Sequence, residues 1–164
     1  MDHNNQKDTF VNVVSENIGI IHKICNIYCN TQEDKKDMMQ EITLQLWKSF
    51  PRFQKRSKFS TWMYKIALNT AITNIRKSKR NPLREVISDK IPDLPEKEHI
   101  PSLDNDINSL YKAITKLNDI EKSIIFLYLE KTIYHEIGDI VGISEKNVSV
   151  KIVRIKNKLQ KLLT

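Results

Sequence analysis

Glycine is scarce in this sequence, with three residues among 164. That leaves no Gly-rich loop of the dinucleotide-binding or P-loop type. Long apolar runs are also missing: no stretch approaches the roughly 18 consecutive apolar residues of a membrane-spanning helix, so we expect no membrane insertion. The first ten residues are polar and include acidic side chains, unlike a secretory signal. Two cysteines four residues apart cannot build a disulfide framework, which favours a cytoplasmic location.

Acidic side chains are absent from residues 42–84, although this stretch carries eleven lysines and arginines. The chain as a whole has 27 basic and 20 acidic residues, a formal net charge of +7. So much uncompensated positive charge in one stretch attracts polyanions, because binding them releases counterions. A solvated basic face is the alternative, but the complete lack of acid favours a nucleic-acid partner.

Four of the five prolines lie in one acidic segment, residues 81–108, which has a net charge of −4. Helices do not run through prolines at this spacing. We therefore predict an extended linker over 81–108 between two domains, 1–80 and 109–164.

Apolar residues recur at spacings of three and four in both predicted domains, as in amphipathic helices. No sustained period-two pattern with turn signals occurs, so the fold class is all-α, with two small helical domains. In the first domain the pattern predicts three helices: over 8–29, from Thr31 to Phe50-Pro51, and from a cap at Ser60 to Pro82. In the second domain it predicts one helix that contains Leu110, Ile114 and Leu117 and another that follows the capping pair Asn118 and Glu121. Two further helices are predicted over 133–141 and 145–163.

The last two of these helices have the spacing of a helix-turn-helix. Gly138 stands where two helices approach closely, and Gly142 stands where the chain leaves the first helix with positive φ. Ser144 can cap the second helix. An ordinary helical hairpin with a solvated polar face is the alternative, but the glycine, apolar and cap positions all agree with DNA binding.

The second helix of such a motif enters the major groove of DNA. Arg154 and Asn147 have the donors and acceptors to read base edges, and Val150 could meet a thymine methyl group. The predicted DNA-binding residues of this helix are Lys146, Asn147, Ser149, Val150, Lys151, Val153 and Arg154.

Two N-terminal patterns complete the picture: Asp37-Met38-Met39-Gln40-Glu41, and the basic and aromatic segment 53–80. With the helix-turn-helix, they resemble a bacterial sigma factor of the sigma-70 family, of the extracytoplasmic-function (ECF) type. That type keeps region 2, here about 10–80, and region 4, here about 109–162. The resemblance implies that the DNA-binding residues of the helix-turn-helix bind the −35 element of a promoter. The resemblance implies that Asp37, Met38, Gln40 and Glu41 form the segment that binds RNA polymerase core. Met38 would face the hydrophobic interior, while Asp37, Gln40 and Glu41 form a polar docking edge.

The resemblance also implies that region 2 binds the melted −10 element. Cations interleaved with aromatic rings suit a separated strand, because cations hold phosphates while rings receive unstacked bases. Trp62 is either a core residue or a stacking platform, and its helical spacing with Ile66 favours the core. The predicted −10 DNA-binding residues are Arg52, Phe53, Lys55, Arg56, Lys58, Phe59, Trp62, Asn69 and Arg76.

The expected function is that of an alternative sigma factor, which binds the β′ and β subunits of polymerase core and promoter DNA, both duplex and melted. The resemblance further implies an anti-sigma partner, because exposed docking and DNA surfaces need covering between uses. One alternative is a helix-turn-helix regulator whose N-terminal half is a sensor or dimerisation module. Another is an interaction protein that contacts no DNA.

Catalytic and cofactor chemistry finds no support in the sequence. No nucleophile–base pattern stands out, so we expect no enzyme and no cofactor. His22, Cys25 and Cys29 could be drawn as a metal site, but Cys25 continues an apolar stripe, which favours core packing and no metal. One departure from the family pattern concerns the first helix of the motif, where we expect Thr132 to be the cap.

Overall fold

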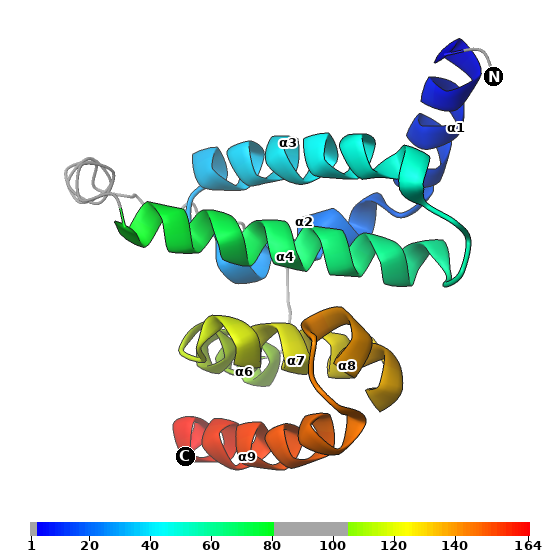
Figure 1. Cartoon of the computed structure of the whole chain (residues 1–164). Helices are drawn as coiled ribbons and strands as arrows, with labels where there is room; N and C mark the ends of the chain where they lie inside the picture. Colours follow the sequence, from blue (N-terminus) through cyan, green and yellow to red (C-terminus); the bar gives the residue numbers. More distant parts are fainter. Residues whose placement is uncertain (1–2, 81–104) are drawn as a thin grey trace. The chain divides into compact units, whose positions relative to one another are not determined.

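Two compact units make up the chain, Met1–Ile91 and Pro92–Thr164, here called unit 1 and unit 2. The computed structural model describes residues 3–80 and 105–164, and every regular element within them is helical, which confirms the all-α prediction (Figure 1). None of these helices has the length and hydropathy needed to cross a membrane. Residues 81–104 of the expected linker lie outside the described residues, as does Pro82. The helix α6 (Asn105–Thr115) begins before the expected boundary at residue 109.

Unit 1 is organised around its longest helix, α4, which packs against both α2 and α3 (Figure 1). Its elements are α1 (His3–Glu16), α2 (Ile18–Tyr28), α3 (Gln32–Ser49), the short 3-10 helix η1 (Phe50–Arg52) and α4 (Phe59–Arg80). The side chains sealed between α2, α3 and α4 include Ile21, Ile24, Ile42, Leu46, Met63 and Leu68. Each of them contributes about 2 kcal/mol by leaving water, so this core fixes the outer faces of α3 and α4.

The expected single helix over 8–29 is wrong, because the chain breaks at Asn17. That residue leaves helical geometry, with φ −114° and ψ 16°. Its side-chain amide donates a hydrogen bond to the carbonyl of Val13, at 2.9 Å. Asparagine competes with the helix in this way, and the apolar spacing continues across the break without revealing it.

The start and the end of α3 are as expected. Thr31 is the N-cap, and its hydroxyl accepts from the backbone N–H of Asp34 at 3.0 Å. The α-helix ends at Ser49, before Phe50-Pro51.

The expected cap at Ser60 is wrong, because α4 begins one residue earlier, at Phe59. The N–H of Trp62 donates to the carbonyl of Lys58 at 3.2 Å, which closes the first turn. Packing of the Phe59 ring against Phe53 and Trp62 accompanies this earlier start.

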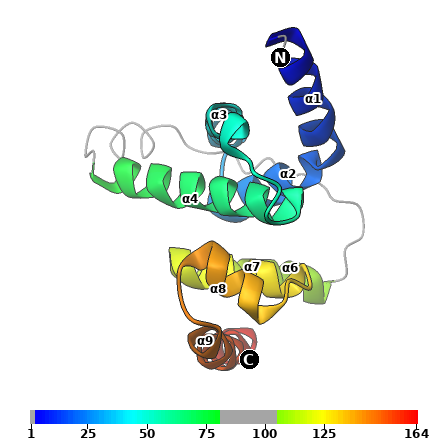
Figure 2. The same ribbon diagram turned by 45° about the vertical axis from the view of Figure 1, so that its right-hand side comes forward.

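Unit 2 consists of α6, α7 (Asp119–Leu129), α8 (Tyr134–Val141) and α9 (Glu145–Leu163). The long helix α9 packs against the other three (Figure 2). Its buried stripe is Val148, Ile152, Ile155 and Leu159. The opposite side of α9 therefore remains open to a partner.

Asn118 and Glu121 form the expected capping box at the start of α7. The N–H of Glu121 donates to Asn118 Oδ1 at 2.8 Å, and the N–H of Asn118 donates to Glu121 Oε2 at 3.1 Å. The preceding helix α6 ends at Thr115, so Leu117 lies beyond it, although its side chain is buried as expected.

Candidate nucleic-acid interface

The turn between α8 and α9 depends on two glycines. A Cβ at Gly138 would lie 2.6 Å from the backbone carbonyl oxygen of Ile143, closer than real Cβ atoms approach. Gly142 has φ +86°, the left-handed conformation that ends α8. The N–H groups of Gly142 and Ile143 both donate to the carbonyl of Gly138, at 2.7 and 3.0 Å. Both glycines therefore act as the sequence predicts.

The caps of the two helices differ. Ser144 caps α9 as expected, since its hydroxyl accepts from the N–H of Asn147 at 3.2 Å. The expected cap at Thr132 is wrong: Ile133 holds the N-cap position of α8 and makes no side-chain cap bond. The first turn of α8 is closed by its backbone alone, with the N–H of Ile137 donating to the carbonyl of Ile133 at 3.0 Å.

The outward side of α9 carries the predicted −35 residues. Six of the seven are exposed, and Lys151 is half-buried. Val150 is 43% exposed and Val153 is 58% exposed. Arg154 and Asn147 lie on the same exposed side of the helix. The helix therefore presents apolar and hydrogen-bonding groups together, the mixture that base edges require.

Two contacts secure α9 on α7. Lys158 Nζ lies 3.1 Å from Glu121 Oε2, so the capping carboxylate also forms an ion pair. Lys156 Nζ donates to Tyr128 Oη at 2.7 Å and lies 4.4 Å from the centre of its ring. The hydrogen bond to Tyr128 raises the pKa of Lys156 above its ordinary value. Lys156 and Lys158 thus both make side-chain contacts within unit 2.

In unit 1, the rings of Phe53, Phe59 and Trp62 form an aromatic cluster. Their centroids are 5.0 to 5.6 Å apart. Phe50 lies 6.3 Å from Trp62 and joins the cluster to Phe10. All three rings of the cluster are half-buried. Trp62 thus packs within the unit and also keeps some of its surface accessible, so the structure shows features of both alternatives.

Basic side chains flank this cluster in the sequence, at the end of η1 and in the loop before α4. Arg52, Lys55, Arg56 and Lys58 are all exposed. Lys55 has φ +54°, which is uncommon for a residue other than glycine. Four of the predicted cations and the three predicted rings therefore belong to one short stretch of chain, residues 52–62, at the start of α4.

The predicted docking edge lies on α3. Asp37 and Gln40 are exposed and Glu41 is half-buried, whereas Met38 is 6% exposed and faces the interior as expected. The sequence analysis missed Leu44, which is 44% exposed one turn after Gln40 and Glu41. A single exposed leucine is common on protein surfaces, so it is its position beside the polar edge that makes Leu44 a candidate for docking.

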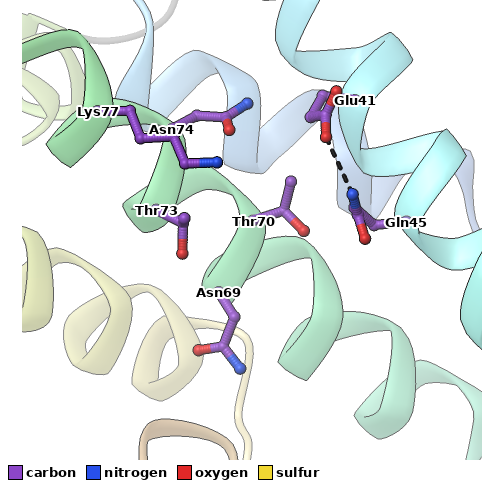
Figure 3. Close-up of a pocket in the computed structure, with 7 residues that line it drawn as sticks. All are labelled: Glu41, Gln45, Asn69, Thr70, Thr73, Asn74 and Lys77. Atoms are coloured by element: carbon purple, nitrogen blue, oxygen red, sulfur yellow. Dashed lines mark hydrogen bonds between the residues drawn. The ribbon is translucent and has the colours of Figure 1, made fainter. Parts of the chain in front are cut away.

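Asn69 lies in a polar cleft between α3 and α4, while Arg76 is exposed elsewhere on α4. The cleft has a volume of about 230 Å³ (Figure 3). The lining residues are Glu41, Gln45, Asn69, Thr70, Thr73, Asn74 and Lys77. Of these, the sequence analysis singled out Glu41 and Asn69. The recurrence of Asn69, Thr73 and Lys77 every four residues was a signal that could have revealed the α4 wall.

Cys25 and Cys29 are buried thiols of α2. Burial raises the pKa of Cys25 to about 11 and that of Cys29 to about 12. Among residues 3–80 and 105–164, no group of three or more His, Cys, Asp or Glu side chains is arranged to hold a metal ion. The core-packing interpretation of Cys25 is confirmed by its burial.

Comparison with known proteins bears on both units. The sigma-70 region 2 family model matches residues 13–81. The chain is 28% identical to the ECF RNA polymerase sigma factor SigW of Bacillus subtilis, with 96% of this chain and 90% of SigW covered. It is 26% identical to the ECF RNA polymerase sigma-E factor of Haemophilus influenzae, with 81% and 78% covered.

Two solved structures share the fold. One is the sigma factor RpoE in complex with the anti-sigma factor NepR from Bartonella quintana, with a TM-score of 0.72, 19% identity and coverage of 93% of this chain and 97% of that one. The other is CnrH in complex with the cytosolic domain of CnrY, with a TM-score of 0.66, 18% identity and coverage of 96% and 88%. The family model, the relatives and the shared fold agree with the motifs: residues 13–81 are a sigma-70 region 2, and over most of its length the chain is similar to ECF RNA polymerase sigma factors.

Proposed function

We propose that the two units divide the work of a sigma factor between three surfaces. The docking edge on α3 binds the polymerase core. The loop before α4, its aromatic cluster and Asn69 hold the melted −10 strand, while the exposed side of α9 reads the −35 duplex. The chain acts by binding and performs no catalytic step. We also propose a cytoplasmic location, since polymerase and promoter DNA are found there.

The observation that carries this proposal is the separation of two unlike DNA surfaces into two units. Unit 1 offers cations around half-buried rings, which suit unstacked bases. Unit 2 offers one exposed helix face, which suits a major groove. Once both units are held on polymerase, binding at one surface raises the effective concentration of the other.

Promoter opening in vitro tests the proposal. The full chain is mixed with polymerase core and a promoter of its host whose transcription requires the chain, and unpaired thymines are detected with permanganate. We expect reactive thymines near the −10 element only when core and chain are both present. A regulator that uses its helix-turn-helix alone would bind duplex without core and open nothing.

An anti-sigma partner is part of the proposal. It is supported by the fold shared with two proteins that were solved in complexes, one of them with an anti-sigma factor. Exposed Leu44 in unit 1 and exposed Val150 and Val153 in unit 2 are surfaces that such a partner would cover. Co-purification of the tagged full chain from its own host, in growth conditions where the chain is inactive, would identify the partner.

A further inference from the structure

The positive charges of α9 are not equally available to a partner. The cationic side chains of this helix are those of Lys146, Lys151, Arg154, Lys156, Lys158 and Lys161. Lys156 contacts the neutral hydroxyl of Tyr128, so no opposite charge compensates it there. Among the described residues, Lys158 is the one cation of α9 that forms an ion pair, and its partner is Glu121 of α7. Within residues 105–164, a carboxylate therefore compensates a single positive charge of α9.

Lys158 continues the side of α9 that carries the predicted base-reading residues. Residues at spacings of four, three and four form one stripe along the helix: Asn147, Lys151, Arg154 and Lys158. A helix rises 1.5 Å per residue, so Lys158 lies about 16 Å beyond Asn147 along the axis, whereas the major groove is about 12 Å wide. When the first turns of α9 read base edges, Lys158 is therefore nearer to backbone phosphates than to bases. Phosphate contacts carry no sequence information, so an unpaired Lys158 would add sequence-independent binding.

The carboxylate of Glu121 is fixed in place before Lys158 reaches it. Glu121 Oε2 accepts from the N–H of Asn118 in the capping box, at 3.1 Å. Lys158 Nζ then lies 3.1 Å from Oε2 and 3.4 Å from Oε1. The side chain of Lys158 is still 49% exposed and that of Glu121 is 22% exposed. A DNA phosphate that approaches the ammonium group therefore has to compete with Glu121 for it.

Stability does not require a negative charge at position 121. Glutamine can take the same place in a capping box. Asp119 already supplies an acidic side chain to the first turn of α7. An ion pair whose lysine is half exposed adds little to the unfolding free energy. The charge of Glu121 therefore has its main consequence in what Lys158 can bind.

We propose that Glu121 is a specificity-determining residue of unit 2, because it keeps Lys158 away from DNA phosphates. Glu121 acts through Lys158, as a positioning residue, and touches no base. Phosphate contacts supply nearly all of sequence-independent binding, but only part of the binding that also reads bases. When Asn147 and Arg154 hold α9 at a fixed depth in the groove, Lys158 gains less than on DNA where α9 can shift freely. The inference rests on the proposed function, in which α9 reads the −35 duplex.

The test measures binding of the full chain on polymerase core to two short duplexes, by competition in fluorescence anisotropy. One duplex carries the −35 region of a host promoter whose transcription requires the chain, and in the other the −35 bases are shuffled. Glu121→Gln keeps a capping partner and removes the charge. We expect its affinity for the shuffled duplex to rise about twofold to fivefold, with a smaller gain on the −35 duplex. The slope of log affinity against log salt should steepen by about 0.9, as for one added phosphate contact.

A second substitution assigns the gain to Lys158. In the wild-type chain, Lys158→Met should change affinity little, because Glu121 already compensates the charge. In the Glu121→Gln chain, Lys158→Met should abolish the gain and restore the original salt slope. Asp106→Asn removes an exposed acid from α6 of the same unit and should leave the slope unchanged. Core is present in every measurement, so its own contribution cancels when variants are compared.

The outcomes separate this inference from the proposed function. A gain that survives Lys158→Met means that Glu121 repels DNA directly, and it overturns the inference. Equal gains for Glu121→Gln and Asp106→Asn, equal gains on the two duplexes, or an unchanged salt slope overturn it as well, and all of these leave the sigma-factor surfaces standing. A clear loss of affinity from Lys158→Met in the wild-type chain also overturns it, since Lys158 would then already bind phosphate. No preference of the wild-type complex for the −35 duplex overturns both the role of α9 and this inference.

Discussion

The helix-turn-helix of unit 2 and the α3–α4 face of unit 1 both present polar side chains, but they are built differently. In unit 2, residues close in sequence set the geometry: Gly138, Gly142 and Ser144 lie within seven positions. In unit 1, Glu41 and Lys77 line one cleft although 36 positions separate them. A site built locally tolerates little change at its turn, whereas a site built across helices depends on the core beneath it.

The largest effect is expected in unit 2, where a substitution in the turn tests how strictly neighbouring residues set the geometry. Gly138→Ala pushes a Cβ against the carbonyl oxygen of Ile143, and the backbone there has no flexible end to move. We expect a loss of up to about 3 kcal/mol from the unfolding free energy of unit 2. Both tryptophans lie in unit 1, so tryptophan fluorescence follows unit 1 while far-ultraviolet circular dichroism follows both. In the Gly138→Ala variant, circular dichroism should therefore show an additional unfolding transition at lower denaturant concentration, while the transition followed by tryptophan fluorescence stays unchanged.

Gly19→Ala is the matched control, since a Cβ there meets nothing within 4 Å. Alanine suits a helix better than glycine by about 0.5–1 kcal/mol, so unit 1 should be unchanged or slightly stabilised. If Gly138→Ala lowers the unfolding free energy no more than Gly19→Ala does, then the close approach of α8 to the turn does not require a glycine at position 138.

Substitution of the docking edge should separate core binding from DNA binding. The double variant Asp37→Ala, Gln40→Ala removes two exposed polar groups of α3. We expect core affinity to fall about tenfold or more, as for residues at the centre of an interface, with duplex affinity unchanged. Leu44→Ala should add to the loss.

The control for the docking edge is Asp8→Ala, Asn12→Ala, which removes an exposed acid and an exposed amide from α1. Affinity for core is measured by competition with a labelled wild-type chain. Equal losses in the two double variants would show that charge alone, and not the α3 edge, governs docking.

The reverse pattern is expected for α9. Arg154→Ala should lower affinity for −35 duplex about tenfold to a hundredfold, or about 1–3 kcal/mol, with core binding intact. Lys161→Ala removes the same charge from an exposed position nearer the end of the helix. A purely electrostatic role predicts similar losses for both, and a base-reading role predicts a change of sequence preference for Arg154→Ala alone.

The helix-turn-helix of unit 2 was easier to predict from the sequence than the α3–α4 face of unit 1. Caps and turns depend on a few adjacent residues, and the sequence analysis placed Thr31, Asn118, Gly142 and Ser144 correctly. The errors also have local causes: Asn17 breaks a helix whose apolar spacing continues, and Ile133 begins one without a polar cap. Burial of Met38 followed from its spacing.

The spacing of Asn69, Thr73 and Lys77 could have revealed one wall of the α3–α4 cleft, but not which residues of α3 face it. Gln45 and Thr73 are ordinary polar helix residues until packing of α3 on α4 brings them together. The exposure of Leu44 likewise depends on which side of α3 meets α4, and apolar spacing alone did not reveal it. The position of the cleft and the exposure of Leu44 therefore became clear only from contacts between segments that are distant in the sequence.

The N-caps of α7 and α9 test whether unit 2 is stabilised by interactions between residues close in sequence. Asn118 and Glu121 exchange two hydrogen bonds, while Ser144 accepts one. Asn118→Ala should cost about 1–2 kcal/mol and Ser144→Ala about 0.5–1 kcal/mol of unfolding free energy. Urea titration followed by circular dichroism measures both. A larger loss for Ser144→Ala would mean that the single cap bond of α9 stabilises unit 2 more than the capping box of α7 does.

Alkaline pH should destabilise unit 1 through its two buried thiols. Burial raises the pKa of Cys25 to about 11 and that of Cys29 to about 12, against 9.0 for an ordinary thiol. The neutral thiols therefore contribute their full stability below pH 9, and this contribution is lost as pH rises toward 12, because the unfolded chain ionises first. The urea midpoint followed by tryptophan fluorescence should fall over this range. In a Cys25→Ala, Cys29→Ala variant the fall should be smaller, since the remaining decline comes from groups other than thiols. An unchanged slope would mean that water reaches both sulfur atoms in solution.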